Sequence, residues 1–138
     1  MFLSLSGSDF LSVAIASVAT FVLGGIWFTQ VVDRIYLVAL GRVATPNQKP
    51  APIVIIGPLV CNLVAILTSA LLIRMLRIES IAGALGLGAL VGVGYVLSTC
   101  MNVAINPNFP RPFLYTLINA PYFIGASLIS CVIIVAVH

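Results

Sequence analysis

One stretch of the chain decides its fold class. Residues 81–105 read IAGALGLGALVGVGYVLSTCMNVAI, and none of these 25 residues carries a charge. An α-helix rises about 1.5 Å per residue, so about 20 apolar residues cross the hydrocarbon core of a bilayer, which is about 30 Å thick. The stretch is therefore predicted to be a transmembrane helix.

Three more uncharged windows of similar length lie on the two sides of it. With residues 81–105 included, the predicted spans are 10–31, 53–73, 81–105 and 113–137. They occupy most of the 138 residues and leave no room for a soluble domain. We expect one all-α transmembrane domain over residues 1–138, a membrane-embedded four-helix bundle with short loops. Residues 33–40 are apolar enough to form a short interfacial helix, which Gly41 ends.

The composition of the whole chain agrees with a membrane location. Hydrophobic residues make up 62% and charged residues 7%, whereas a soluble domain is about a quarter charged. This composition excludes a soluble globular protein, and it excludes a disordered chain because disorder needs low hydrophobicity. A net charge of +3 from six basic residues makes no basic stripe, so we expect no nucleic-acid partner.

The charged residues and the lone histidine are predicted to lie at or beyond the ends of the spans. A proton-coupled transporter would therefore lack an ionisable group inside the bilayer, and haem or di-iron sites would lack their ligands. We expect no enzyme activity, no catalytic residue, no metal and no cofactor. The groups are Asp9, Asp33, Arg34, Arg42, Lys49, Arg74, Arg77, Glu79, Arg111 and His138.

Lysine and arginine are distributed unevenly between the two ends of the predicted bundle. The basic residues are Arg34, Arg42, Lys49 and Arg111 in the first and third connections, and Arg74 and Arg77 at the opposite end. Under the positive-inside rule this excess favours a cytoplasmic location for the first and third connections. We expect an integral protein of a bacterial inner (plasma) membrane with both termini outside.

Small residues recur at four-residue spacing in three of the spans. Helices in a bilayer associate by close packing at such residues, because lipid supplies no hydrophobic drive. The third span has a second small face at Gly86 and Gly94, so we expect it to be packed on two sides and central. The predicted packing faces are Ser8, Ser12, Ala16, Thr20 and Gly24; Gly57, Cys61, Ala65 and Ser69; and Ala84, Gly88 and Gly92.

The uncharged polar side chains concentrate in the half of the bilayer next to the first and third connections. They fit two interpretations. In the first, asparagines form hydrogen bonds between helices and aromatic rings mark the interface. In the second, they line a ligand cavity, which Pro121 supports because it frees the carbonyl of Leu117. The candidate cavity residues are Asn62, Asn102, Asn119, Trp27 and Tyr122, with Arg111 at the rim.

Two groups of short motifs resemble a known family. Residues 21–29 read FVLGGIWFT and precede an apolar stretch that ends at Gly41; residues 109–113 and 117–122 read FPRPF and LINAPY. The pattern resembles the domain-of-unknown-function 1761 family, small bacterial and fungal membrane proteins with four helices. Phe123 stands where many members have histidine, which argues against histidine-dependent chemistry here. The family has no established activity, so the resemblance implies the architecture alone.

Two functions fit these predictions. The first is a membrane component without catalytic machinery, either a homo-oligomer or an accessory subunit of a larger membrane complex, with the lipid bilayer as its surroundings. The second is a carrier, channel or binder for a small neutral or amphipathic solute or lipid. It would use the uncharged cavity in one leaflet and act as an oligomer, because four packed helices enclose no lumen.

Overall fold

The computed structural model describes residues 6–45 and 49–137, and within these ranges all regular structure is helical. His138 lies outside them. This confirms the predicted all-α fold class. Two segments, η1 and η2, are π-helical and continue α1 and α4. The elements are α1 (Gly7–Ile26), η1 (Trp27–Val31), α2 (Asp33–Ala39), α3 (Pro52–Met75), α4 (Ile81–Ala89), η2 (Leu90–Leu97), α5 (Ser98–Ala104) and α6 (Pro112–Ala136).

Four helical rods are long and apolar enough to cross a membrane. The first joins α1 to η1, and the third joins α4, η2 and α5; α3 and α6 are single helices. Their bounds differ from the sequence-based ones by at most three residues. Four apolar helices packed together indicate a membrane environment. The rods are Gly7–Val31, Pro52–Met75, Ile81–Ala104 and Pro112–Ala136.

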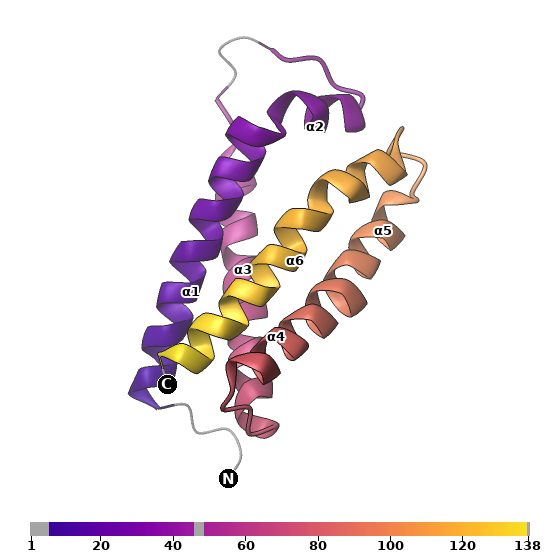
Figure 1. Cartoon of the computed structure of the whole chain (residues 1–138). Helices are drawn as coiled ribbons and strands as arrows, with labels where there is room; N and C mark the ends of the chain where they lie inside the picture. The colour runs from indigo at the N-terminus through magenta and orange to yellow at the C-terminus, as the bar shows by residue number, and fades with distance from the viewer. Residues whose placement is uncertain (1–5, 46–48, 138) are drawn as a thin grey trace.

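The central helix of the bundle is α6. It packs against α1, α2, α3 and all three segments of the third span, whereas that span makes at most isolated contacts with α1 or α3. Figure 1 shows α6, in yellow, between α1 on one side and α4 and α5 on the other. The prediction that the third span is central is therefore wrong. Its second small face, at Gly86 and Gly94, is exposed.

The two ends of the bundle are built differently. At one end, α2 turns across the tops of the other helices, near the connection between α5 and α6 (Figure 1). Gly41 ends α2 with a φ of 65°, a conformation that favours glycine. The N–H of Gly41 bonds to the carbonyl of Val38 and that of Arg42 to the carbonyl of Leu37, which is the Schellman pattern of a helix C-terminus. The start of α1, the end of α6 and the α3–α4 connection lie at the opposite end (Figure 1).

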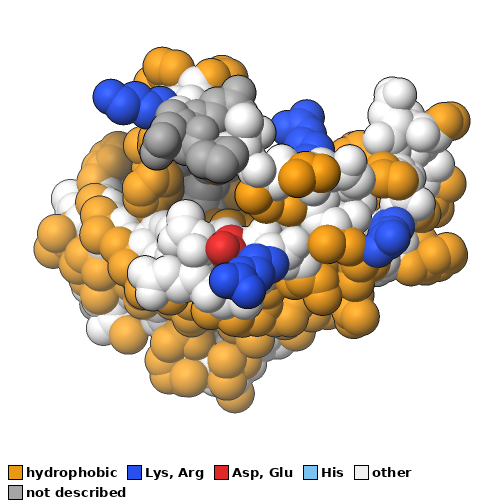
Figure 2. All heavy atoms as spheres, turned by 90° about the horizontal axis from the view of Figure 1, so that it is seen from above, with side chains coloured by type: hydrophobic (Ala, Val, Ile, Leu, Met, Phe, Trp, Pro, Cys, Tyr) orange, Lys and Arg blue, Asp and Glu red, His pale blue; other side chains and the backbone are white. Residues whose placement is uncertain are grey.

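Basic side chains are spread over the α2 end rather than gathered. Figure 2 views this end from above and shows Lys and Arg groups separated by apolar and neutral surface.

The core of the bundle contains two hydrophobic clusters. The cluster nearer α2 contains Val32, Ala39 and Ile118 with the rings of Trp27, Phe28, Tyr36 and Tyr115 packed around them.

Candidate functional site

The structure does not bring the six predicted cavity residues into one cavity. Asn62 and Tyr122 line a slot. The side chains of Trp27 and Asn119 donate hydrogen bonds to helix backbone. Asn102 and Arg111 are exposed.

Trp27 joins the first span to α6. Its indole Nε1 donates a hydrogen bond to the carbonyl oxygen of Ile118 at 3.0 Å. Pro121 lies inside α6 and removes the N–H that would bond to Leu117. The indole takes the next carbonyl along the helix instead. Trp27 therefore fixes the contact between two helices at the point where the proline weakens one of them.

Asn119 and Asn62 use their amides in different ways. Asn119 is 2% exposed, and its Nδ2 donates to the carbonyl of Tyr115 in the same helix at 2.7 Å. Asn62 Nδ2 donates to Thr20 Oγ1 at 2.5 Å, and that hydroxyl donates to the carbonyl of Ala16 at 2.8 Å. Asn62 thus makes the interhelical hydrogen bond expected of an asparagine in a bilayer, whereas Asn119 does not.

Asn102 and Arg111 lie near the α2 end of the bundle. Asn102 is exposed on α5, and its side chain makes no hydrogen bond within residues 6–45 and 49–137. Arg111 is exposed and precedes α6, where its backbone carbonyl accepts the N–H of Tyr115 at 2.9 Å. Neither of these two side chains lines the slot, so a ligand role for Asn102 and Arg111 stays a prediction.

The predicted packing face of the first span lies inside the bundle for most of its length. Ser12, Ala16 and Thr20 are fully buried, while Ser8 is exposed. Gly24 lies beneath the ring of Tyr122: a Cβ atom on this glycine would approach the phenol oxygen to 3.0 Å. The Tyr122 hydroxyl also lies 3.5 Å from the carbonyl of Thr20.

The third span packs on α6 through its predicted face. Ala84 is buried. A Cβ atom on Gly88 would come within 2.9 Å of Leu128 Cα, and one on Gly92 within 3.1 Å of Ser127 Cβ. The two backbones therefore approach closely along this line: Gly88 leaves no room for a Cβ atom against the backbone of α6, and Gly92 leaves little.

The predicted packing face of α3 differs from the other two. Cys61 and Ala65 are exposed, and a Cβ atom on Gly57 would touch only Ile53 of its own helix. Ser69, at the end of this face, is buried. The face was expected to meet another helix, but α3 and the third span do not close against each other, and Cys61 and Ala65 line the gap between them.

That gap is a slot of about 350 Å³ with α6 as its floor. Asn62 and Tyr122 are the only predicted cavity residues among those that line it. Depth along each helix is readable from the sequence, but the direction in which a side chain points is not, so Phe123 and Ser127 went unpredicted. The walls are α3 from Pro58 to Ser69 and η2 at Val91 and Val96, and the floor is α6 from Tyr122 to Ser130.

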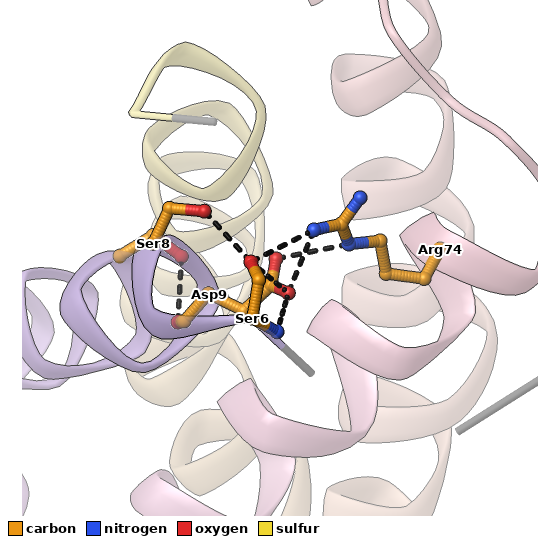
Figure 3. A network of polar contacts seen from close by, with 5 residues as sticks. Ser6, Ser8, Asp9 and Arg74 are labelled. Atoms are coloured by element: carbon orange, nitrogen blue, oxygen red, sulfur yellow. Dashed lines mark hydrogen bonds and ion pairs between the residues drawn. The ribbon is translucent and has the colours of Figure 1, made fainter. Parts of the chain in front are cut away.

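An ion pair joins α1 to α3 at the end of the bundle that is opposite α2 (Figure 3). Arg74 Nη2 lies 2.7 Å from Asp9 Oδ2, and Arg74 Nε donates to Asp9 Oδ1 at 2.9 Å. Asp9 also accepts the backbone N–H of Ser6 at 2.6 Å and its hydroxyl at 2.8 Å. The N-cap of α1 is Ser6.

The pair lies at the ends of two candidate spans. Asp9 is 1% exposed and Arg74 34%; Asp9 lies in the first turn of α1 and Arg74 in the last turn of α3. These positions agree with the expectation that charges lie at or beyond the ends of the spans, but the pairing of the two residues was not predicted. One signal was available: a lone acid in the first turn of one span and a lone arginine in the last turn of the antiparallel next span share one end of the bundle.

Thiol and carboxylate groups are dispersed. Within the described residues, no three His, Cys, Asp or Glu side chains lie close enough to hold a metal ion. The three cysteines are free: Cys61 is exposed, Cys100 partly buried and Cys131 buried.

The sequence matches the family described as "Protein of unknown function (DUF1761)" over residues 11–135. The chain belongs to the DUF1761 family. This confirms the family resemblance seen in the motifs. No curated protein and no solved structure matches the chain. The two motif groups that carry the DUF1761 resemblance meet in space: Gly24 packs under Tyr122, and Trp27 bonds to Ile118. In this DUF1761 protein they hold the first span against the central helix.

Proposed function

We propose that this DUF1761 protein is a membrane component without catalytic machinery that works in an assembly, and that it associates through the outer face of its third span. A homo-oligomer is the form that the chain's own surface supports. A larger complex that the chain joins as an accessory subunit would use the same face.

Two outward glycines carry the proposal. Gly88 and Gly92 face α6, whereas Cβ atoms on Gly86 and Gly94 would meet nothing within 4 Å. Glycine in a helix interior is less favourable than alanine by about 0.5–1 kcal/mol, and toward lipid it adds no packing. Close approach of another helix explains why glycine occupies this face.

Polar side chains on the same span add a second reason. Thr99 and Asn102 are exposed and make no side-chain hydrogen bond within the described residues, and Tyr95 is 74% exposed. Ser98 is exposed as well, but its hydroxyl donates to the carbonyl of Gly94. An amide or hydroxyl facing hydrocarbon without a partner is costly, by about 1–3 kcal/mol on protein scales. A neighbouring helix in an assembly supplies donors and acceptors that lipid tails lack.

The non-catalytic part of the proposal rests on how the polar groups are used. Asp9 and Arg74 neutralise each other, and Trp27, Asn62 and Asn119 are engaged in bonds that hold helices. No acid or base remains among these groups for general catalysis.

Energy transfer between two fluorescently labelled populations of the chain in liposomes tests the association. We expect transfer for the natural chain and a loss of affinity of at least about tenfold, which is about 1.4 kcal/mol, for Gly86→Leu and Gly94→Leu. Gly25→Leu is the matched control. Gly25 lies on the first span, and a Cβ atom there also meets nothing within 4 Å.

Equal losses in all three variants would contradict an interface on the third span. If the natural chain shows no transfer, cross-linking through Gly94→Cys in native membranes separates the remaining cases. An adduct with another membrane protein fits a subunit role, and no adduct at all argues against association by this face.

A second candidate is a binder or carrier for a small neutral or amphipathic molecule. The slot lined by Asn62 and Tyr122 favours it. A channel through one chain is not favoured, because α6 fills the centre of the bundle.

A further inference from the structure

The slot between α3 and the third span is long and narrow. On α3 it extends from Pro58 to Ser69, eleven residues or about 16 Å at a rise of about 1.5 Å per residue. The slot has a volume of about 350 Å³, whereas the same length of an α-helix with its side chains would occupy on the order of 1,300 Å³. The slot runs along the helices, with α6 as its floor.

These dimensions decide which kind of molecule fits. An α-helix with side chains is about 10 Å across, which is a cross-section of about 80 Å². A helix from a second copy would have to force α3 and the third span apart, while a single unbranched hydrocarbon chain enters without moving them. The slot is also placed at hydrocarbon depth: Pro58 and Ser69 each lie six residues from an end of α3, about 9 Å along the axis.

The walls offer an apolar environment. The hydroxyls of Ser69 and Ser130 donate to the carbonyls of Ala65 and Ser127 in their own helices, at 2.9 and 3.1 Å. Asn62 donates to Thr20 across the bundle. These three donors are thus already engaged. Ser127 is the slot residue whose hydroxyl makes no hydrogen bond within the described residues, so a polar ligand would gain little beyond that one group.

We propose that the slot binds one acyl chain of a membrane phospholipid, which enters sideways from the bilayer between α3 and the third span and lies along α6. Small side chains at Cys61 and Ala65 leave the space that the chain fills. This site is separate from the outer face with Gly86 and Gly94, so it stands whether or not the protein associates.

Photo-cross-linking tests the proposal in nanodiscs that contain phosphatidylcholine with a diazirine midway along one acyl chain. Mass spectrometry then maps the adducts. We expect at least about fivefold more adduct per exposed area on the slot residues of α3 and α6 than on the outward side of α3. Ala65→Leu, which fills the slot, should lower the slot adducts about fivefold.

Val64→Leu is the matched control, because Val64 is the exposed outward neighbour of Ala65 on the same helix. It should leave the slot adducts unchanged. Cys61→Phe gives a second filled slot if Ala65→Leu lowers the folded yield, which the emission of Trp27 reports. Adducts that simply follow exposure overturn the proposal, and so do equal effects of Ala65→Leu and Val64→Leu. Slot residues that take up adduct in nanodiscs with one chain but not in nanodiscs with two chains would assign the slot to a second copy instead.

Discussion

At the scale of single residues, Asp9 and Arg74 form the one ion pair found within the described residues. Asp9 lies in the first turn of α1 and Arg74 in the last turn of α3. A carboxylate at a helix N-terminus and a guanidinium at a helix C-terminus each oppose the end charge of the helix dipole. The pair is therefore favoured by both helices as well as by its own two-point contact.

The burial of the two partners predicts an asymmetric response to mutation. Arg74→Gln leaves the carboxylate of Asp9 buried without its cation, and we expect it to lower the free energy of unfolding by about 3 kcal/mol. Asp9→Asn should cost less, because Arg74 is partly exposed and its guanidinium can turn toward water. The double variant Asp9→Asn/Arg74→Gln should regain part of the loss. Reversible unfolding in mixed micelles measures all three.

Arg77→Gln is the control, since Arg77 is exposed and has no ion pair within the described residues. It should stay within about 0.5 kcal/mol of the natural chain. An Arg74→Gln variant as stable as this control would mean that the ion pair contributes nothing to the fold.

Residue-level chemistry could be predicted from the sequence only in part. Trp27, Asn62, Asn119 and Tyr122 stand out as the polar and aromatic groups at one depth, and each takes part in a specific contact. Their partners are not readable, because depth fixes a level in the bilayer and leaves the direction around the helix open. Asn119, for example, turns back to its own helix.

At the scale of elements, the third span shows what a small-residue pattern can and cannot predict. Two faces of it carry glycine, and the sequence alone suggested that both would pack inside the bundle. In the structure Gly88 and Gly92 touch α6, while Gly86 and Gly94 face outward. A small face indicates that a close neighbour is sterically possible, but it does not say whether the neighbour belongs to the same chain.

The two faces should respond differently to one added methyl group. A Cβ atom on Gly88 would meet the backbone of Leu128 at 2.9 Å, so Gly88→Ala must push α4 away from α6. We expect this to lower the free energy of unfolding by about 2 kcal/mol. Gly86→Ala meets no atom within 4 Å and should raise stability by up to about 1 kcal/mol, because alanine favours the helix more.

Thermal unfolding in dilute detergent, where chains are separate, compares the two variants. A Gly86→Ala variant that loses as much stability as Gly88→Ala would show that α4 packs with its other face inward. The comparison also separates folding from association, since the proposed interface contains Gly86 and not Gly88.

At the scale of the whole molecule, hydropathy was sufficient to place the four spans, because crossing a bilayer is a property of each helix alone. It did not reveal that α6 is the centre, since that depends on how helices pair. Pro121, Tyr122 and Asn119 lie on this last helix, next to the first span. The chain therefore completes its core only when its C-terminal helix inserts against helices made earlier.

The distribution of basic residues between the two ends of the bundle predicts its orientation in the membrane. The start of α1 and the end of α6 lie on the side of the α3–α4 connection (Figure 1). Four basic residues, Arg34, Arg42, Lys49 and Arg111, belong to the α2 end, and two, Arg74 and Arg77, to the other. Arg74 is partly exposed and its charge is paired with Asp9, whereas Arg77, in the α3–α4 connection, is exposed and has no ion pair within the described residues. The positive-inside rule then places the α2 end in the cytoplasm.

Reporter fusions in a bacterial host measure this orientation. We expect alkaline phosphatase fused after the last residue to be active and a green fluorescent protein at the same place to be dark, because that terminus lies outside. The same reporters placed after Arg42 should give the reverse pattern. Replacing Arg34 and Arg42 by glutamine reduces the basic excess to two against two, so this variant should show mixed orientation. A fluorescent C-terminal fusion of the natural chain would instead place both termini in the cytoplasm, and the charge difference would then not be what orients this bundle.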